Sequence, residues 1–195
     1  MALSPLVHDD IERILLGEHE IRSGIERVAA EVNAHYAGDE LTVVAVLKGS
    51  VIFVADLIRR LPLPLRLAFV WAESYRGGSS AGRLELGGRL SEEDVRGRSV
   101  LLVDDILDSG RTLAAIRAEL DARGAKDVRT CVFLDKPARR AVALEADHVA
   151  FEIEDHFVVG YGLDFAGRYR NLPYVGTLKP RVLASAEPLV GEARP

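Results

Sequence analysis

At 195 residues and 21.3 kDa, the chain is long enough for one domain with a substantial core, and its 48% hydrophobic content argues against disorder. Its 25 Lys and Arg residues against 30 Asp and Glu residues give a net charge of −5, which opposes general nucleic-acid binding because that binding needs a basic face. No basic N-terminal region precedes an apolar run, and no apolar stretch is long enough to cross a bilayer, so we expect a cytoplasmic protein without a membrane or nucleic-acid partner.

The alternation of helical and strand-like segments predicts the fold class. Ile21, Ile25, Val28, Val32 and Tyr36 recur at helical spacing and predict an amphipathic helix. Six apolar runs are typical of strands, at residues 41–47, 65–71, 100–103, 130–134, 148–153 and 157–161. Strands that alternate with helices favour an α/β fold, a mainly parallel twisted sheet with helices on both faces, whose ligands bind at the carboxyl ends of the strands.

The first of these strands ends at Lys48 and Gly49, which lead into an apolar helix over residues 50–61. Gly49 lets the backbone approach a ligand closely, and Lys48 adds a positive charge beside it. This signal is weak by itself, because an exposed lysine before a helix is common. The helix is apolar on nearly every side, which indicates burial either against a second subunit or within the chain.

Residues 74–89 contain five glycines and few side chains that could pack. Such a composition is typical of a mobile loop near or over a site, and an inert surface connection is the alternative.

The most informative stretch is residues 100–116, where an apolar strand runs into three aspartates, then Ser-Gly-Arg-Thr, then a helix. Backbone N–H groups and the positive end of a helix dipole favour a phosphate at this turn, and Ser109, Gly110 and Thr112 are small enough to admit it. The aspartates would repel a phosphate, which indicates that they address ribose hydroxyls and a divalent cation of the same ligand. An acidic, solvated helix start is the alternative, but it explains one aspartate better than three.

Residues 103–112 resemble the motif that binds phosphoribosyl pyrophosphate (PRPP) in the type I phosphoribosyltransferases: an apolar strand, two acids, two apolar residues, Asp, Ser or Thr, Gly, any residue and Thr. Residues 151–165 resemble the purine-binding stretch of the hypoxanthine-guanine phosphoribosyltransferases. The resemblance extends from about Val43 to Leu178, with several motifs in the same order. It implies the type I phosphoribosyltransferase fold with a small hood formed by the terminal segments.

The resemblance also implies a role for each matching residue. Asp108 is the implied catalytic base. The implied PRPP and 5′-phosphate site consists of Asp104, Asp105, Asp108, Ser109, Gly110, Arg111 and Thr112. Pyrophosphate is expected to bind to Lys48 and Gly49, in a turn with a cis peptide bond before the lysine, and to Arg170. The remaining implied roles are purine binding by Lys136, Phe157, Val158 and Asp164, closure of the lid by Ser74 and Tyr75, and metal binding by Asp104, Asp105 and Asp164.

The implied reaction transfers the 5-phosphoribosyl group from PRPP to N9 of hypoxanthine or guanine, with Mg²⁺ as cofactor, and gives IMP or GMP and pyrophosphate. Lys136 would donate a hydrogen bond to the oxygen at purine C6, which disfavours adenine because its amino group is also a donor. Xanthine remains a rival substrate, since only a missing hydrogen-bond partner distinguishes it. The implied assembly is a homodimer or homotetramer.

Two other classes of protein fit the sequence less well. A nucleotide-hydrolysing enzyme would need a Gly-x₄-Gly-Lys-Ser/Thr motif, and the nearest string, residues 77–84, has Arg and Leu where Lys and Ser/Thr belong. A regulatory module that binds RNA or DNA is opposed by the acidic balance of the chain and by the intact candidate base Asp108.

Residues 1–183 are expected to form one domain, and residues 184–195 have too little apolar surface to order themselves and are expected to form a disordered tail. Cys131, the single cysteine, lies in an apolar run and is expected to be a buried, unreactive thiol.

Overall fold

The computed structural model describes residues 9–74, 84–88 and 90–185. Its six main strands span Leu41–Val46 (β2), Leu65–Ser74 (β3), Leu84–Gly88 (β4), Ser99–Leu107 (β5), Asp127–Asp135 (β6) and His148–Glu152 (β7). They form one sheet in the order β4-β3-β2-β5-β6-β7. All neighbours are parallel except β4, which adds an antiparallel edge to β3. The predicted, mainly parallel sheet is therefore confirmed.

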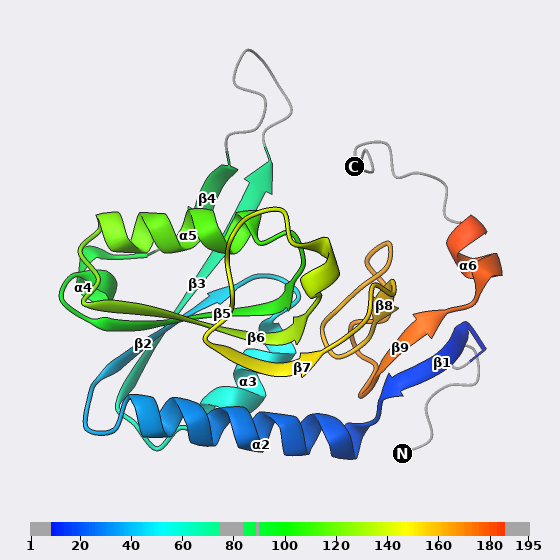
Figure 1. Cartoon of the computed structure of the whole chain (residues 1–195), viewed down its shortest axis with the longest axis horizontal. Helices are drawn as coiled ribbons and strands as arrows, with labels where there is room; N and C mark the ends of the chain where they lie inside the picture. Colours follow the sequence, from blue (N-terminus) through cyan, green and yellow to red (C-terminus); the bar gives the residue numbers. More distant parts are fainter. Residues whose placement is uncertain (1–8, 75–83, 89, 186–195) are drawn as a thin grey trace, which may run out of the picture.

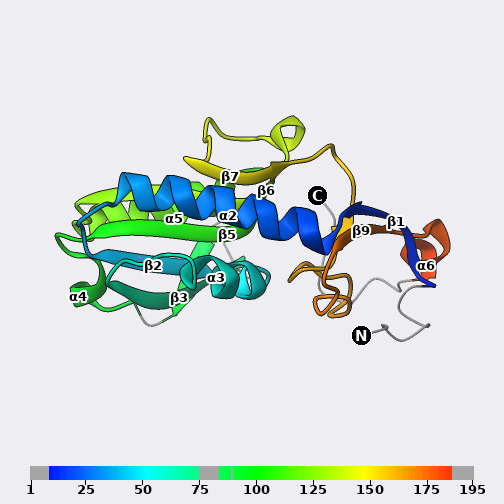
Figure 2. The same cartoon turned by 90° about the horizontal axis from the view of Figure 1, so that it is seen from below.

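Helices cover both faces of this sheet (Figures 1 and 2). On one face lie α2 (Glu18–His35) and α3 (Val51–Ile58), and on the other α5 (Arg111–Ala122) and the short α4 (Glu92–Val95). The apolar stripe predicted for α2 is buried from Ile21 to Val32, because it is the side of the helix that packs on the sheet. In the described part of the chain, no helix has the length and apolar character that crossing a bilayer requires.

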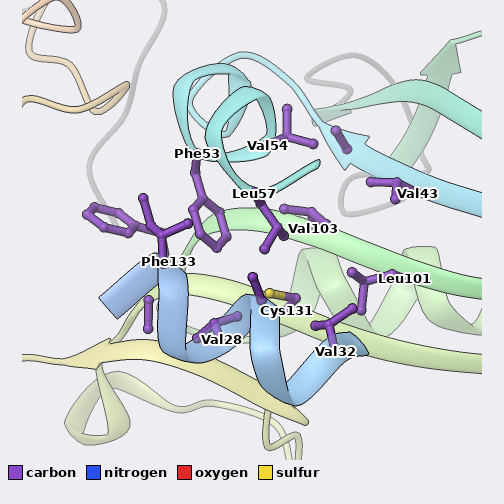
Figure 3. Packing of buried hydrophobic residues seen from close by; sticks show 14 of the residues in the cluster. Val28, Val32, Val43, Phe53, Val54, Leu57, Leu101, Val103, Cys131 and Phe133 are labelled. Carbon is purple, nitrogen blue, oxygen red and sulfur yellow. The ribbon is translucent and has the colours of Figure 1, made fainter. Parts of the chain in front are cut away.

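The larger core lies between the sheet and the two helices α2 and α3 (Figure 3). Phe53 of α3 meets Phe133 of β6 with ring centroids 5.5 Å apart, and Val28 of α2 belongs to the same cluster. Full burial of a side chain of this size contributes about 1.5–3 kcal/mol. Cys131 is completely buried among these residues, as predicted, and burial raises the pKa of its thiol.

A second, three-stranded antiparallel sheet forms the hood (Figure 1). It joins β1 (Ile11–Leu16), β9 (Val175–Leu178) and β8 (Val158–Val159) in the order β1-β9-β8, and α6 (Pro180–Ser185) follows β9. The hood has a small core of its own, and the hydroxyl of Tyr169 donates to the carboxylate of Asp10 at 2.8 Å. The expected hood from terminal segments is thus present, and β8 joins it from a segment that the sequence indicated only as a strand.

The last helix extends beyond residue 183, where the tail was predicted to start. Ala184 and Ser185 complete the last turn of α6 instead of belonging to a disordered segment. The helix forms because Pro180 suits a first helical turn and Val182 is buried in the core of the hood. Residues 186–195, the rest of the predicted tail, lie outside the described residues.

The carboxyl ends of the parallel strands lie at the edge of the main sheet that faces the hood (Figure 1). The turns that leave β2, β5 and β6 therefore meet the segments of the hood at this edge. Ser74, predicted as a lid residue, is the last residue of β3. Tyr75, its predicted partner in the lid, lies outside the described residues.

His148, on the outermost parallel strand, predicts a pH-dependent stability. The residue is 8% exposed, its Nδ1 lies 3.5 Å from a carboxylate oxygen of Glu31, and neither ring nitrogen has a hydrogen-bond partner among the described residues. Burial lowers the pKa of His148, although Glu31 acts in the opposite direction. Because the unfolded chain then binds this proton more readily, the free energy of unfolding should decrease as the pH falls below about 6.5, the ordinary histidine value.

We expect His148→Leu to flatten this decrease when urea unfolding is measured between pH 7 and pH 5. The exposed His19 on α2 offers a matched control, and His19→Leu should retain the wild-type slope. Identical slopes for the wild-type and His148→Leu proteins would contradict the prediction.

Candidate active site

The site begins at the carboxyl end of β5, where two adjacent aspartates leave the core. Asp104 is 8% exposed, and its carboxylate accepts a hydrogen bond from the backbone N–H of Asp105 at 2.9 Å. Burial, followed by repulsion from Asp105, raises the pKa of Asp104 well above its ordinary range. Burial also raises the pKa of Asp105. Two buried carboxyl groups side by side favour the approach of a cation or of hydroxyl donors, which would stabilise their charged forms.

Residues 108–112, here called the phosphate loop, connect β5 to α5. Gly110 has a φ of +80°, and a Cβ at this position would contact Val142 and Arg140. Helix α5 begins at Arg111, so the N–H groups of its first turn, including that of Thr112, have no acceptors within the helix. These donors and the positive end of the helix dipole suit a phosphate group.

Asp108 opens the phosphate loop, and its Oδ1 is buried. The Nε of Arg139 lies 2.9 Å from this oxygen, but the oxygen has no hydrogen-bond partner among the described residues. Arg139 ends a short 3₁₀ helix, η1 (Pro137–Arg139), and also lies 3.4 Å from the carboxylate of Asp155. The Asp108 carboxylate is thus paired with a charge through Oδ1, and its side chain is 42% exposed, so a ligand can still reach the carboxylate.

In the turn after β2, the backbone at Gly49 lies close to neighbouring segments, as the glycine at this position led us to predict. The Leu47–Lys48 peptide bond is cis, in agreement with the resemblance. A Cβ on Gly49 would collide with the carboxylate of Asp105, so no other residue fits there without a shift. The carbonyl of Gly49 in turn occupies the space where Gly162 would carry a side chain. The main chain after β2 therefore lies directly against the end of β5 and against the purine segment, residues 157–164.

The purine segment presents one exposed ring and one free strand edge. Phe157 is 50% exposed and meets Phe165 edge to face, with ring centroids 5.4 Å apart. Val158 is buried and begins β8, which pairs with β9 on one side and is the edge strand of the hood. An exposed ring and unpaired main-chain groups suit a flat heterocycle with hydrogen-bonding edges.

Arg170 lies just beyond the purine segment and contacts it. Its Nη2 lies 2.6 Å from the carboxylate of Asp164, and its Nη1 donates to the carbonyl of Gly162 at 2.6 Å. The Arg170 guanidinium also acts to lower the pKa of Asp105, so its charge reaches the end of β5. Arg170 further lines a cavity of about 400 Å³ between α2, α3 and residues 170–173, which none of the β5 aspartates lines.

Lys136 follows β6 and is 6% exposed. Its Nζ donates to the carbonyl of His156 at 2.5 Å and lies 3.9 Å from the carboxylate of Asp155. Burial lowers the pKa of Lys136, although Asp108 and Asp155 oppose this effect. An ammonium group has three donors, so Lys136 can bind a ligand oxygen in addition to the His156 carbonyl.

The structure thus brings the predicted residues from three strand ends and from the purine segment to one edge of the sheet. Within residues 9–74, 84–88 and 90–185, no three His, Cys, Asp or Glu side chains form a metal site by themselves. Asp104 and Asp105 offer two carboxyl groups, whereas Asp164 is already paired with Arg170. Since Mg²⁺ typically takes one or two carboxylates together with substrate phosphates, this donor set fits a magnesium ion that arrives with its ligand.

Sequence reasoning missed the contacts that hold these parts together. The hydroxyl of Tyr161 donates to the carboxylate of Asp56 at 2.6 Å and joins the purine segment to α3. These two residues lie 105 positions apart, so no local pattern pairs them. Arg139 and Arg140 were visible beside Lys136, but two consecutive arginines have no spacing signal that distinguishes a site residue from an exposed one.

Comparisons with known proteins agree with this geometry. The family profile described as a phosphoribosyl transferase domain matches residues 14–166. The hypoxanthine-guanine phosphoribosyltransferase of Bacillus subtilis is 40% identical over 181 residues, which are 92% of this chain and 100% of that protein. The bifunctional protein TilS/HprT of Listeria innocua is 45% identical over 177 residues, which are 90% of this chain but only 27% of that longer protein.

Among solved structures, a hypoxanthine phosphoribosyltransferase from Staphylococcus aureus superposes with a TM-score of 0.86 at 38% identity, covering 93% of this chain and 98% of that one. This superposition shows that the two proteins share the fold over nearly their whole length. The chain therefore belongs to the phosphoribosyl transferase domain family, among the hypoxanthine-guanine phosphoribosyltransferases.

Proposed function

We propose that this chain is a purine salvage enzyme that transfers the 5-phosphoribosyl group of PRPP to N9 of hypoxanthine or guanine, giving IMP or GMP and pyrophosphate. The observation that carries the proposal is the meeting of three unlike binding elements at one edge of the sheet. These elements are the phosphate loop at the start of α5, the acidic end of β5 against Gly49, and Lys136 beside the free edge of β8.

The phosphate loop supports a fixed position for the 5′-phosphate of the sugar. Ser109, Gly110, Arg111 and Thr112 would bind it through main-chain N–H groups and small polar side chains at the start of α5. Asp104 and Asp105 lie in β5 shortly before the phosphate loop, where their carboxyl groups can accept hydrogen bonds from the ribose hydroxyls.

Departure of pyrophosphate requires positive charge at the opposite end of the sugar. Lys48 and Arg170 lie on the two segments that meet at Gly49 and Gly162, and they would hold the leaving group there. When bound, Mg²⁺ supplies further positive charge to the pyrophosphate. Asp104 and Asp105 would hold the ion, and Asp164, which is paired with Arg170, is the third candidate ligand.

The purine would stack on Phe157 and form hydrogen bonds with the main chain at Val158, with Asp164 nearby. In the transfer step, N9 forms a bond to C1′ of the sugar while the bond from C1′ to pyrophosphate breaks. The carboxylate of Asp108 accepts the proton that leaves N7, a role supported by its place at the start of the phosphate loop and by its side chain, which is 42% exposed.

Lys136 supports a preference for purines with an oxygen at C6. Its ammonium group can donate to that oxygen and cannot accept from the amino group of adenine. Xanthine should be a poorer substrate, because its second oxygen at C2 would meet carbonyl oxygens of the backbone instead of donors. It is still the rival substrate, since only this missing hydrogen-bond partner separates it from hypoxanthine. Nothing in the acidic composition of the chain favours a nucleic acid as substrate or partner.

An exposed apolar face supports assembly into a homodimer, or into a homotetramer built from such dimers. Leu67, Phe69 and Trp71 alternate along β3 and are 37–42% exposed, while Ala68 and Val70 between them are buried under α5. The three exposed side chains, here called the apolar face, therefore point to the other side of the sheet, the side that carries α3. Val51 and Ile52 of α3 are also 37–41% exposed. A second copy of the chain is the occupant that this surface fits best.

A cytoplasmic location is part of the same proposal. The buried, unpaired thiol of Cys131 gives the fold no disulfide to depend on, which is typical of proteins in reducing compartments.

The decisive test offers hypoxanthine, guanine, xanthine and adenine separately to the protein with PRPP and Mg²⁺, and follows ultraviolet absorbance and pyrophosphate release. Nucleotide should form with hypoxanthine and guanine, more slowly with xanthine and least with adenine. Lys136→Gln should lower kcat/KM for the two preferred bases about tenfold to a hundredfold, the loss expected for one hydrogen bond from a charged donor. No pyrophosphate release with any base would overturn the proposed function.

Asp108→Asn should lower kcat with hypoxanthine by about 10² to 10⁴, because the amide cannot accept the N7 proton. The substitution preserves the shape of the side chain, so stabilisation of the variant by GMP in a thermal shift assay should persist. A kcat within tenfold of the wild-type value would exclude Asp108 as the base.

Phe69→Glu should convert the assembly to monomers in light scattering, because it places a charge in the centre of the apolar face. Trp71, the single tryptophan, lies on the same face, and its fluorescence should shift to the red as water reaches it. Ile14→Glu, at an exposed apolar position in the hood, is the control and should leave the assembly intact. A wild-type monomer, or an unchanged mass for Phe69→Glu, would refute this interface.

A further inference from the structure

Arg140 makes several polar contacts within the site, and the proposed function gives this residue no role. Its side chain is only 16% exposed. Its Nη1 donates to the carbonyl of Leu107 at 3.1 Å and to the carbonyl of Asp108 at 2.6 Å, and its Nη2 donates to the carboxylate of Asp135. One largely enclosed guanidinium therefore donates to three acceptors.

The three acceptors belong to two different parts of the site. Leu107 and Asp108 form the junction between β5 and the phosphate loop, whereas Asp135 is the last residue of β6 and directly precedes Lys136. The same two parts are joined by main-chain hydrogen bonds, from Lys136 N–H to the Leu107 carbonyl at 3.0 Å and from Ala141 N–H to the Ser109 carbonyl at 3.0 Å. Arg140 thus braces the 5′-phosphate region against the lysine that selects the purine.

The aliphatic part of the Arg140 side chain also packs against the phosphate loop. A Cβ on Gly110 would lie 3.3 Å from Cδ of Arg140 and 3.0 Å from Cγ2 of Val142. The left-handed turn of the loop at Gly110 is therefore packed directly on the side chain that binds the carbonyls before it.

The chemistry of these contacts requires a guanidinium. A buried positive charge is costly unless a partner neutralises it, and the Asp135 carboxylate does so here. The planar fork of arginine presents several donors in fixed directions, while the single nitrogen of lysine cannot reach two carbonyls on one side and a carboxylate on the other. Arg139, the neighbouring residue, instead faces the Asp108 carboxylate and is 43% exposed.

We infer that Arg140 is a positioning residue, which fixes the phosphate loop and Asp108 relative to Lys136 without contacting substrate itself. The inference rests on the proposed function for its kinetic consequence, because the distance between the sugar phosphate and the purine matters only if both bind at this edge. Its structural part, the bracing of residues 107–113 against residues 135–141, is independent of that function.

The chain offers a matched control for substitutions at Arg140. Arg98 is similarly buried, with its side chain 17% exposed, and it also makes side-chain hydrogen bonds, to Thr42 at 3.1 Å and to Glu40 at 2.8 Å. It lies just before β5, at the opposite end of the sheet from the phosphate loop. Arg98→Ala should therefore lower stability without changing the site.

The first experiment measures hydrogen–deuterium exchange in Arg140→Ala, Arg140→Lys and Arg98→Ala, and needs no catalytic activity. Both Arg140 variants should exchange faster at residues 107–113 and 135–141, and Arg98→Ala should not. Arg140→Lys covers the case in which Arg140→Ala does not fold. Wild-type exchange at these segments in the lysine variant would overturn the inference.

The second experiment compares kinetics with hypoxanthine and PRPP. Both Arg140 variants should lose about tenfold to a hundredfold in kcat/KM, as expected for hydrogen bonds to a charged group, while Arg98→Ala stays within about twofold of the wild type. Millimolar ethylguanidinium should restore part of the activity of Arg140→Ala, and ethylammonium, with the same charge, should not. Equal losses of kcat/KM in the Arg140 and Arg98 variants, or full activity of Arg140→Lys, would overturn the inference. An inactive wild-type protein would instead refute the proposed function, and the hydrogen–deuterium exchange experiment would then decide whether Arg140 braces the two segments.

Discussion

The site depends on a close main-chain approach at Gly49. The position of a side chain at Gly49 is occupied by the carboxylate of Asp105, and the Gly49 carbonyl fills the corresponding space at Gly162. The segments that follow β2 and β7 can therefore meet main chain to main chain, with the Asp105 side chain of β5 packed against Gly49. A side chain at Gly162 would force these two main-chain segments apart, and one at Gly49 would displace the Asp105 carboxylate from the site.

The charges of the site are balanced against one another within the fold. The adjacent carboxyl groups of Asp104 and Asp105 have raised pKa values, and the Arg170 guanidinium acts in the opposite direction on the pKa of Asp105. Arg139 faces Asp108, and Arg140 is neutralised by Asp135. A chain with net charge −5 can thus bind a highly anionic ligand, because the cations that matter are placed locally.

Much of the architecture follows from local sequence patterns. The apolar runs that became β2, β5 and β6 are buried on both faces, so their composition is distinctive, and the stripe of α2 has a clear helical period. The strands β1 and β9 were not predicted. β1 has the burial pattern of a half-exposed strand, and β9 has only four residues, so each is defined by pairing with the other, about 165 residues away in the chain, as with Ile11 and Leu178.

The sequence by itself determined the phosphate loop and the acids before it, because residues 104–112 run without interruption from the end of β5 into the start of α5. It also placed Lys48 and Lys136 just after predicted strands, whereas the roles of Lys136 and Phe157 came from the resemblance to the hypoxanthine-guanine phosphoribosyltransferases. Only the tertiary structure decided how these parts meet. Three kinds of contact join residues that are far apart in sequence: the packing of Gly49 on Asp105, the hydrogen bond between Tyr161 and Asp56, and the contacts of Arg140. No periodic pattern in the sequence predicts these contacts, because they arise from the order of strands in the sheet and from the close packing of its loops.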